Sequence, residues 1–357
     1  MNSMAMTDPA FWQGKRVLLT GHTGFKGGWL SLWLQSMEAV IQGMALPPPT
    51  HPCLFEVACV AGGLEHGLVD IRNFDAIKAQ MDEFQPEIIF HLAAQPLVRL
   101  SYQQPVDTYA TNVMGTVHIL EAARHIPSLK AIVNVTTDKC YENREWSWGY
   151  REIEPMGGHD PYSSSKGCSE LISSAYRQSF LQEAGIAIAT ARAGNVIGGG
   201  DWAVDRLVPD ILRSLERKEP VLIRNPHAIR PWQHVLEPLS GYLLLAQQLV
   251  EHGHAYAESW NFGPNDEDAR PVQWIVEHMC TEWGHGASWE MQPGNHPHEA
   301  NYLKLDISKS KQRLRWAPRW GLERSLGSIM EWHQSWLAGK DMRSVCVQHI
   351  KEYTQGF

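Results

Sequence analysis

Short apolar runs alternate with longer amphipathic stretches along the first half of the chain. Apolar runs of this length are typical of buried strands, and the 3.6-residue periodicity between them is typical of helices. Strands are therefore expected at 16–20, 39–41, 68–71, 87–92, 131–135 and 186–190, and helices at 26–37, 73–84 and 105–124. Because strands that alternate with helices form parallel sheets with right-handed crossovers, the pattern predicts an α/β fold with a doubly wound (Rossmann) parallel sheet.

The pattern changes after Gly194, where a run of three glycines at 198–200 interrupts the chain. Further helices are expected at 205–217, 235–251, 271–283 and 322–336. We therefore expect a sheet domain made of residues 12–195 plus about 228–262. A smaller, mainly C-terminal α/β domain would combine about 196–227 with 263–357.

Composition narrows the classes of function. The net charge of −8 disfavours a nucleic acid as partner, because phosphate binding requires basic surfaces. No apolar run approaches the ~18 residues of a membrane span. The six cysteines form no C-x-x-C pair, which argues against a zinc or redox motif and favours reduced thiols in the cytoplasm. No metal site is predicted.

A glycine motif, Gly21-x-x-Gly24-x-x-Gly27, follows the first predicted strand and opens the first predicted helix. Glycine allows the backbone to approach a diphosphate closely, and a helix N-terminus attracts negative charge. The motif in this context favours dinucleotide binding over an ordinary tight turn. No acid at 42–46 could hold the adenosine ribose, but Asp70 could bind the adenine amino group. No Lys or Arg occurs from 28 to 71 to bind a 2′-phosphate, so NAD is favoured over NADP.

Tyr162 and Lys166 lie four residues apart at a predicted helix start, where Asp160 is the expected N-cap and Pro161 the first helical residue. Their side chains share one face of the helix. The ammonium group and the helix N-terminus should both lower the pKa of Tyr162 toward neutrality. A tyrosine of this kind can accept a proton from a sugar hydroxyl whose carbon is being oxidised. The spacing alone also occurs by chance on surface helices.

Thr137, Asp138 and Lys139 follow the fifth predicted strand. Ligands of open parallel sheets bind beyond the carboxyl ends of the strands, so these side chains should face the ligand. The hydroxyl could share a substrate hydroxyl with Tyr162, and the acid beside a lysine could transfer protons. The alternative is an ion pair on the surface at the end of a strand.

Taken together, the motifs resemble those of the extended short-chain dehydrogenase/reductase family. They are the glycine turn, His91-Leu92-Ala93-Ala94-Gln95, Thr111-Asn112-Val113-x-Gly115-Thr116, Tyr162-x-x-x-Lys166 and Arg192-Ala193-Gly194-Asn195-Val196. The pair Thr137-Asp138 is similar to that of the sugar-nucleotide 4,6-dehydratases in this family. Gly199-Gly200-Asp201-Trp202 and Arg230-Pro231-Trp232-Gln233-His234-Val235 are most similar to those of the enzymes that act on CDP-glucose.

The resemblance implies that CDP-glucose is oxidised at C4 with tightly bound NAD, loses water across C5 and C6, and is then reduced at C6. It implies that Tyr162 is the base at C4, that Lys166 holds the nicotinamide ribose, and that Thr137 binds the C4 oxygen. Asp138 would protonate the departing C6 hydroxyl. Lys139 stands where many relatives carry the glutamate that removes the C5 proton, so its role is open. The product would supply deoxysugars of a surface polysaccharide, such as lipopolysaccharide O-antigen.

The resemblance also implies two sets of contacts. The cofactor contacts would be Gly21, Thr23, Gly24, Phe25, Lys26, Gly27, Asp70, Ile71, Leu92, Ala93, Ala94, Thr111, Tyr162, Lys166 and Arg192. The substrate contacts would be Gln95, Asn195, Arg206, Leu207, Arg230, Glu299 and Tyr302. Helices at 103–124 and 161–184 would pair in a homodimer or a homotetramer. The alternatives are a dehydratase for GDP- or dTDP-sugars, a 4-epimerase, or a non-catalytic NAD-binding regulator of the same fold.

Overall fold

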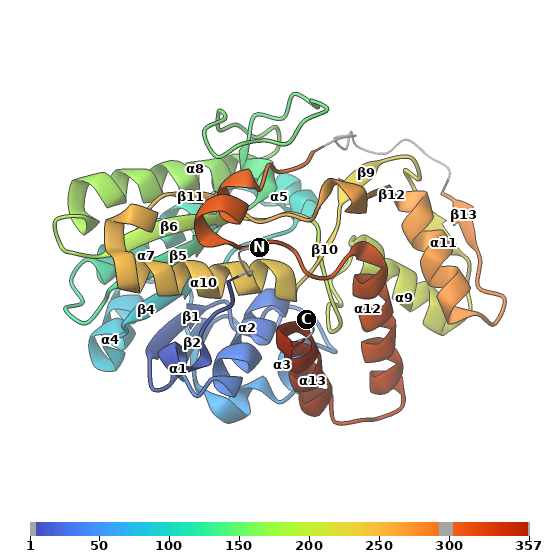
Figure 1. The fold of residues 1–357 in the computed structure, drawn as a ribbon, viewed down its shortest axis with the longest axis horizontal. Coiled ribbons are helices and arrows are strands. Elements are labelled where there is room, and N and C mark those ends of the chain that lie inside the picture. Colours follow the sequence, from blue (N-terminus) through green and yellow to red (C-terminus); the bar gives the residue numbers. More distant parts are fainter. Residues whose placement is uncertain (1–4, 293–302, 356–357) are drawn as a thin grey trace.

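The computed structural model describes residues 5–292 and 303–355 (Figure 1). Within these residues, seven strands form a parallel sheet in the order β11-β6-β5-β4-β1-β2-β3. The strands are β1 (Arg16–Thr20), β2 (Val40–Ala45), β3 (Glu65–Leu68), β4 (Ile88–His91), β5 (Ala131–Val135), β6 (Ala187–Arg192) and β11 (Ser259–Asn261). The prediction of a doubly wound parallel sheet is therefore confirmed.

Helices cover both faces of this sheet, because successive strand residues point to opposite sides. Leu18 and Ile132 face one core, with α4 and α7, whereas their neighbours Leu19 and Val133 face the other, with α2 and α10. The helices are α1 (Pro9–Trp12), α2 (Phe25–Ser36), α3 (Leu54–Val57), α4 (Phe74–Phe84), α5 (Val98–Gln103), α6 (Pro105–Tyr109), α7 (Gly115–Ala123), α8 (Pro161–Tyr176), α9 (Leu207–Arg217), α10 (Leu236–His252), α11 (Val272–Trp283), α12 (Leu322–Leu337) and α13 (Met342–Gln355).

A second, smaller core lies beside the carboxyl end of the sheet, at the right of Figure 1. It joins α9, α11 and α12 with short strand pairs. These pairs are formed by β8 (Val221–Ile223) with β13 (Trp289–Met291), β9 (Ile229–Pro231) with β12 (Ala269–Pro271), and β7 (Val196–Ile197) with β10 (Gln233–His234). This arrangement leaves the carboxyl ends of the strands facing the smaller core.

Three element predictions need correction. The strand expected at 68–71 is β3 at Glu65–Leu68, because the buried side chains of Val69 and Ile71 belong to the turn that follows it. A π-helical turn at Ala110–Met114 joins α6 and α7 into the predicted helix. The helix α13 was not predicted, and it packs on α2 through Trp33 and Tyr353. Its buried side chains belong to the larger core, which also contains those of α2 and α10.

In the part of the chain that the structure describes, no helix combines the length and the apolar character needed to cross a membrane.

Candidate active site

The glycine turn joins β1 to α2 so closely that side chains cannot be accommodated there. Gly21 has a φ of +80°, and a Cβ on it would lie 2.8 Å from the nitrogen of Ala93. A Cβ on Gly27 would lie 2.1 Å from the carbonyl oxygen of Gly21. Gly24 is the N-cap of α2 and brings no capping side chain. The first turn of the helix therefore presents bare backbone N–H groups, which suit a diphosphate.

The end of β4 is held against this turn by Thr20. Its hydroxyl oxygen accepts hydrogen bonds from the backbone N–H groups of Leu92 and Ala93, each at 3.1 Å. Thr23 donates to the carbonyl of Leu46 at 2.9 Å, which fixes the turn to the end of β2. The predicted cofactor residues of both segments therefore line one edge of the sheet.

The residues expected to contact the adenosine half of the cofactor, Asp70 and Ile71, already contact other groups of the protein. The carboxylate of Asp70 pairs with Arg72 at 2.6 Å, so it is already engaged. The Ile71 side chain packs where a Cβ on Gly115 would lie, 2.5 Å from its Cδ1. His22 packs against Gly43 of β2, and its Nε2 lies 2.6 Å from Nδ1 of His66. A histidine pair thus lies beside β2, where an acid is expected in dinucleotide folds.

The helix α8 begins as predicted. Asp160 accepts a hydrogen bond from the backbone N–H of Ser163 at 3.0 Å, and Pro161 is the first helical residue. Lys166 is buried, and its Nζ donates to the carbonyl of Val135 at 3.1 Å. This bond ties the helix to the carboxyl end of β5, so Tyr162 lies where the strand ends.

Thr137 and Asp138 follow β5 directly, and both side chains are buried. The hydroxyl of Thr137 donates to the Asp138 carboxylate at 3.0 Å and also interacts with the phenol of Tyr162. A Cβ on Gly194 would lie 1.9 Å from Oδ2 of Asp138, so only glycine leaves room for this acid. Lys139 differs from its neighbours because its side chain is exposed to solvent.

Burial dominates the acidity of the site. It raises the pKa of Tyr162 to about 12, although the hydrogen bond with Thr137 and the charge of Arg206 act in the opposite direction. The prediction of a lowered tyrosine pKa is therefore wrong for the ligand-free chain, because loss of hydration outweighs the nearby cations. Burial also lowers the pKa of Lys166 to about 8, while Glu170 partly offsets this effect.

Two further cations, Arg206 and Lys26, come from the starts of helices α9 and α2. Arg206, at the N-cap of α9, pairs with Asp201 at 2.7 Å. Lys26, in the first turn of α2, has its pKa lowered to about 8 by burial and by the charges of Lys166 and Arg206. Sequence reasoning included Lys26 only as part of the glycine turn and missed its side chain. The available signal was a cation at a helix N-terminus, where the helix dipole disfavours positive charge.

The guanidinium group of Arg192 is engaged by groups of the protein itself. Its guanidinium group lies within β6, is 3% exposed, and pairs with Glu170 at 2.7 Å. It also donates to the hydroxyl of Tyr141 and to the carbonyl of Glu152. This charge needs its buried partners and holds β6, α8 and the 141–152 segment together, and the predicted cofactor contact of Arg192 stays a prediction.

The structure also places the other predicted site residues, apart from two that lie outside the described part of the chain. Gln95 is held within the protein by Asn112 and Thr108, and Asn195 adopts a φ of +49° just after β6. The remaining positions are Ala94 after β4, Thr111 in the π-helical turn, Phe25 and Leu207 as the first residues of α2 and α9, and Arg230 on β9. Glu299 and Tyr302 lie outside the described residues.

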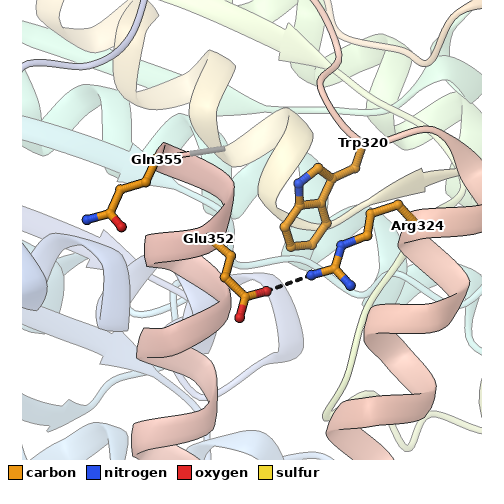
Figure 2. A pocket seen from close by; sticks show the side chains of 4 residues that line it. All are labelled: Trp320, Arg324, Glu352 and Gln355. Atoms are coloured by element: carbon orange, nitrogen blue, oxygen red, sulfur yellow. Dashed lines mark hydrogen bonds and ion pairs between the residues drawn. The ribbon is translucent and has the colours of Figure 1, made fainter. Parts of the chain in front are cut away.

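A separate hollow of about 440 Å³ lies between α12 and α13 (Figure 2). It is lined by Trp320, Arg324, Glu352 and Gln355, and Figure 2 shows Arg324 reaching across to Glu352, with 2.6 Å between the charged groups. None of these residues contributes to the groups around Tyr162. The hollow is therefore not part of the candidate active site.

The chain is similar to known proteins in sequence and in fold. A family model described as GDP-mannose 4,6 dehydratase matches residues 18–328. The chain is 59% identical to CDP-glucose 4,6-dehydratase of Salmonella typhimurium (strain LT2), over 98% of both chains. The fold is similar to UDP-glucose 4-epimerase of Thermotoga maritima, with a TM-score of 0.80, 20% identity, and coverage of 90% of this chain and 99% of that one.

A second solved structure, dTDP-glucose 4,6-dehydratase of Bacillus anthracis in complex with NAD, has a TM-score of 0.75 and 21% identity. The match covers 92% of this chain and all of that chain. At these identities the two structures support the fold alone. The sequence matches extend over most of the chain, and the chain therefore belongs to the GDP-mannose 4,6 dehydratase family.

Proposed function

We propose that the chain is an NAD-dependent 4,6-dehydratase that converts CDP-glucose to CDP-4-keto-6-deoxyglucose. The observation that carries this proposal is the 59% identity to a CDP-glucose 4,6-dehydratase over 98% of both chains. The groups that such chemistry requires, Tyr162, Thr137 and Asp138, are buried together beyond the carboxyl end of β5. A non-catalytic regulator would have no need for this set.

The glycine turn fits a dinucleotide. A Cβ on Gly21 or Gly27 would collide with the protein backbone, so glycine keeps this turn tight, and the first turn of α2 supplies backbone N–H groups for a diphosphate. No Lys or Arg between 28 and 71 is available for a 2′-phosphate, which favours NAD. When bound, the nicotinamide ring supplies the acceptor for a hydride from C4 and the donor of that hydride to C6.

The residues of the chain handle the protons. Tyr162 accepts the proton of the C4 hydroxyl, and Thr137, which interacts with the same phenol, holds the C4 oxygen. Lys166 uses one N–H on Val135, and its other two are available to the ribose of the cofactor and to the phenol oxygen. Asp138 protonates the hydroxyl that leaves C6.

We also propose a homodimer. The segments 105–114 and 171–180, on α6, α8 and their π-helical extensions, expose large apolar side chains that a monomer would leave in water: Val106 at 80%, Met114 at 47%, Leu171 at 60% and Phe180 at 41%. Pairing these segments with their copies would cover this surface. The six cysteines are all free, which favours a reducing compartment such as the cytoplasm.

The substrate is tested by incubating the purified protein with CDP-glucose, dTDP-glucose, UDP-glucose and GDP-mannose in separate reactions. Nuclear magnetic resonance and mass spectrometry would follow the sugar. We expect a 4-keto-6-deoxy product, lighter by one water, from CDP-glucose with the highest kcat/KM. Faster conversion of another nucleotide sugar would contradict the substrate assignment. An isomer of unchanged mass would indicate a 4-epimerase, and no turnover of any sugar would favour a regulatory protein.

A further inference from the structure

Tyr141 follows the proposed acid Asp138 by three residues, and its hydroxyl group is held from two sides. The side chain is 1% exposed. The hydroxyl donates to Oδ1 of Asn261 at 2.8 Å and accepts a hydrogen bond from Arg192 at 2.6 Å. These directions are fixed, because arginine can only donate and the amide nitrogen of Asn261 is used on two backbone carbonyls. The phenol therefore joins the last residues of β6 and β11.

The three-residue 3₁₀ turn that begins with Asp138 is held at both ends by the same strand. Before the turn, the backbone N–H of Thr136 donates to the carbonyl of Ala191 in β6 at 2.9 Å. After the turn, the hydroxyl of Tyr141 is bound to Arg192, which is the next residue of β6. The position of the turn therefore depends on the phenol at one end and on the sheet at the other.

The carboxylate of Asp138 fits into a space that allows little movement. Its Oδ1 accepts a hydrogen bond from the hydroxyl of Thr137 at 3.0 Å. Its Oδ2 occupies the place that a Cβ on Gly194 would take. Gly194 follows Arg192, the partner of the phenol, by two residues. The two segments that meet at the carboxylate are therefore the same two that the hydroxyl of Tyr141 joins.

Tyr141 has no chemical step in the proposed mechanism. Its hydroxyl proton is donated within the protein, and its oxygen already accepts from a guanidinium group. Burial raises the pKa of Tyr141 above its ordinary value, although the charge of Arg192 acts in the opposite direction. The phenol therefore stays protonated at neutral pH. It can hold neighbouring groups in place, but it does not exchange protons with a substrate.

We propose that Tyr141 is a positioning residue for Asp138, whose acid it holds where the C6 hydroxyl of the sugar binds, an inference that rests on the proposed function. Asp138 gives its proton to the C6 oxygen while the C6–O bond breaks, and the electron pair of that bond leaves with the water. This transfer requires hydrogen-bond distance between the acid and the oxygen. Oxidation at C4 belongs to Tyr162, which the capped start of α8 holds. Loss of the Tyr141 hydroxyl should therefore slow the elimination and spare the oxidation.

The test compares Y141F, which keeps the ring and loses only the hydroxyl, with the matched control Y150F. Tyr150 stacks on Tyr141 with 5.3 Å between ring centroids, but its hydroxyl donates to Asn143 at 3.0 Å. With CDP-glucose, Y141F should accumulate NADH together with a 4-keto glucose that retains its C6 hydroxyl. Formation of the 4-keto-6-deoxy sugar should fall about 10–10²-fold, because a misplacement of about 1 Å can cost this much. Y150F should match the wild type in both steps.

The double variant D138N/Y141F separates positioning from a general structural role. If Tyr141 acts through Asp138, its hydroxyl has no further effect on the elimination once the acid is absent. The double variant should therefore eliminate water at the same rate as D138N alone. A further loss in the double variant, equal to the loss that Y141F shows by itself, would overturn the inference.

A readout without turnover is the crystal structure of Y141F. We expect the carboxylate of Asp138 to have left its place beside Gly194. An unchanged carboxylate would overturn the inference. So would wild-type elimination by Y141F, or an equal loss in both steps without accumulated NADH.

R192K serves as a second variant if Y141F does not fold. It keeps a charge beside Glu170, but a single ammonium group replaces the guanidinium fork that also reaches Tyr141. With NAD supplied in excess, R192K should accumulate the same 4-keto glucose, and normal elimination in this variant would overturn the inference. If the wild type itself yields no 4-keto-6-deoxy product from CDP-glucose, the proposed function fails first.

Discussion

The carboxylate of Glu170 on α8 and the guanidinium of Arg192 on β6 lie 2.7 Å apart, and each side chain is 3% exposed. Burial opposes the ionisation of both groups, but their mutual attraction holds the pKa of Glu170 below its ordinary value and raises that of Arg192. Replacing Glu170 by glutamine should lower the free energy of unfolding by about 3–5 kcal/mol, because Arg192 would keep a buried and unbalanced charge.

Urea unfolding of E170Q and of E121Q would measure this loss. Glu121 pairs with Arg124 at 3.3 Å, but both side chains are about one-third exposed. We therefore expect E121Q to cost less than about 1 kcal/mol. Equal losses in the two variants would show that burial does not distinguish these pairs.

Replacing Gly27 by alanine should distort the turn at β1, since the added carbon would lie 2.1 Å from the Gly21 carbonyl oxygen. We expect purified G27A to lose its bound NAD and most of its activity. Gly62 is the control, because a Cβ there meets nothing within 4 Å and its φ is not positive. G62A should keep the cofactor content of the wild type, and normal cofactor content in G27A would argue against the diphosphate site.

Replacing Tyr162 by phenylalanine should lower kcat by about 10²–10⁴-fold with CDP-glucose, because the base at C4 is removed. The melting temperature should stay close to that of the wild type, since the ring itself is kept. Tyr176 on the same helix donates to Glu121 away from the site, so Y176F should retain its activity. An active Y162F would contradict the assignment of Tyr162.

The buried acid Glu237 should make stability depend on pH. Its Oε1 accepts hydrogen bonds from the backbone N–H groups of Arg319 at 2.9 Å and Trp320 at 2.7 Å, and its Oε2 accepts one from the hydroxyl of Tyr353 at 2.7 Å. Burial nevertheless raises the pKa of Glu237 to about 7, from an ordinary value of 4.5. Between these two values the folded state binds more protons than the unfolded state, so stability falls as the pH rises.

The shift of the Glu237 pKa from 4.5 to about 7 corresponds to about 3 kcal/mol of the free energy of unfolding. This contribution is fully present below pH 4.5 and is lost by about pH 7. E237Q removes this titration. The difference in unfolding free energy between wild type and E237Q should therefore decrease as the pH rises from 4.5 to 7. A difference that does not change over this range would show that Glu237 ionises normally in the folded protein.

Replacing Leu171 by aspartate should yield a monomer. Leu171 is 60% exposed on α8, within the apolar surface proposed to pair with a second copy. A charge there would have to be desolvated in the interface. Leu222 on β8 is 53% exposed outside these helices, so L222D is the control. Analytical ultracentrifugation should find a dimer for the wild type and L222D, and a dimeric L171D would contradict the proposed interface.

Elements with strong patterns could be predicted from the sequence. The strand Ala131–Val135 has the predicted bounds because five consecutive buried residues form its apolar run. The edge strand Glu65–Leu68 was misplaced because its four residues are mostly exposed and include the polar Glu65 and His66. The helix α13 was missed although Met342, Cys346 and Tyr353 form a buried stripe at helical spacing. This stripe follows the last predicted helix and was readable from the periodicity.

The site was predictable where local signals suffice. Asp160 caps α8 and Tyr162 meets Thr137, as the spacing and the strand ends indicated. The pairing of Arg192 with Glu170 could not be predicted, because the two residues lie 22 positions apart and only packing reveals their contact. The solvent exposure of Lys139 likewise depends on how the chain is folded around it, so the sequence could not settle its role.

The contact between Gly194 and Asp138 has a consequence for protein engineering. The carboxylate occupies the volume that the first side-chain carbon of any other residue at 194 would require. Randomised libraries that seek new sugar specificities should keep residue 194 constant and diversify residues of the second core instead. Variants selected from such libraries would inherit the acid of the wild type in its original position.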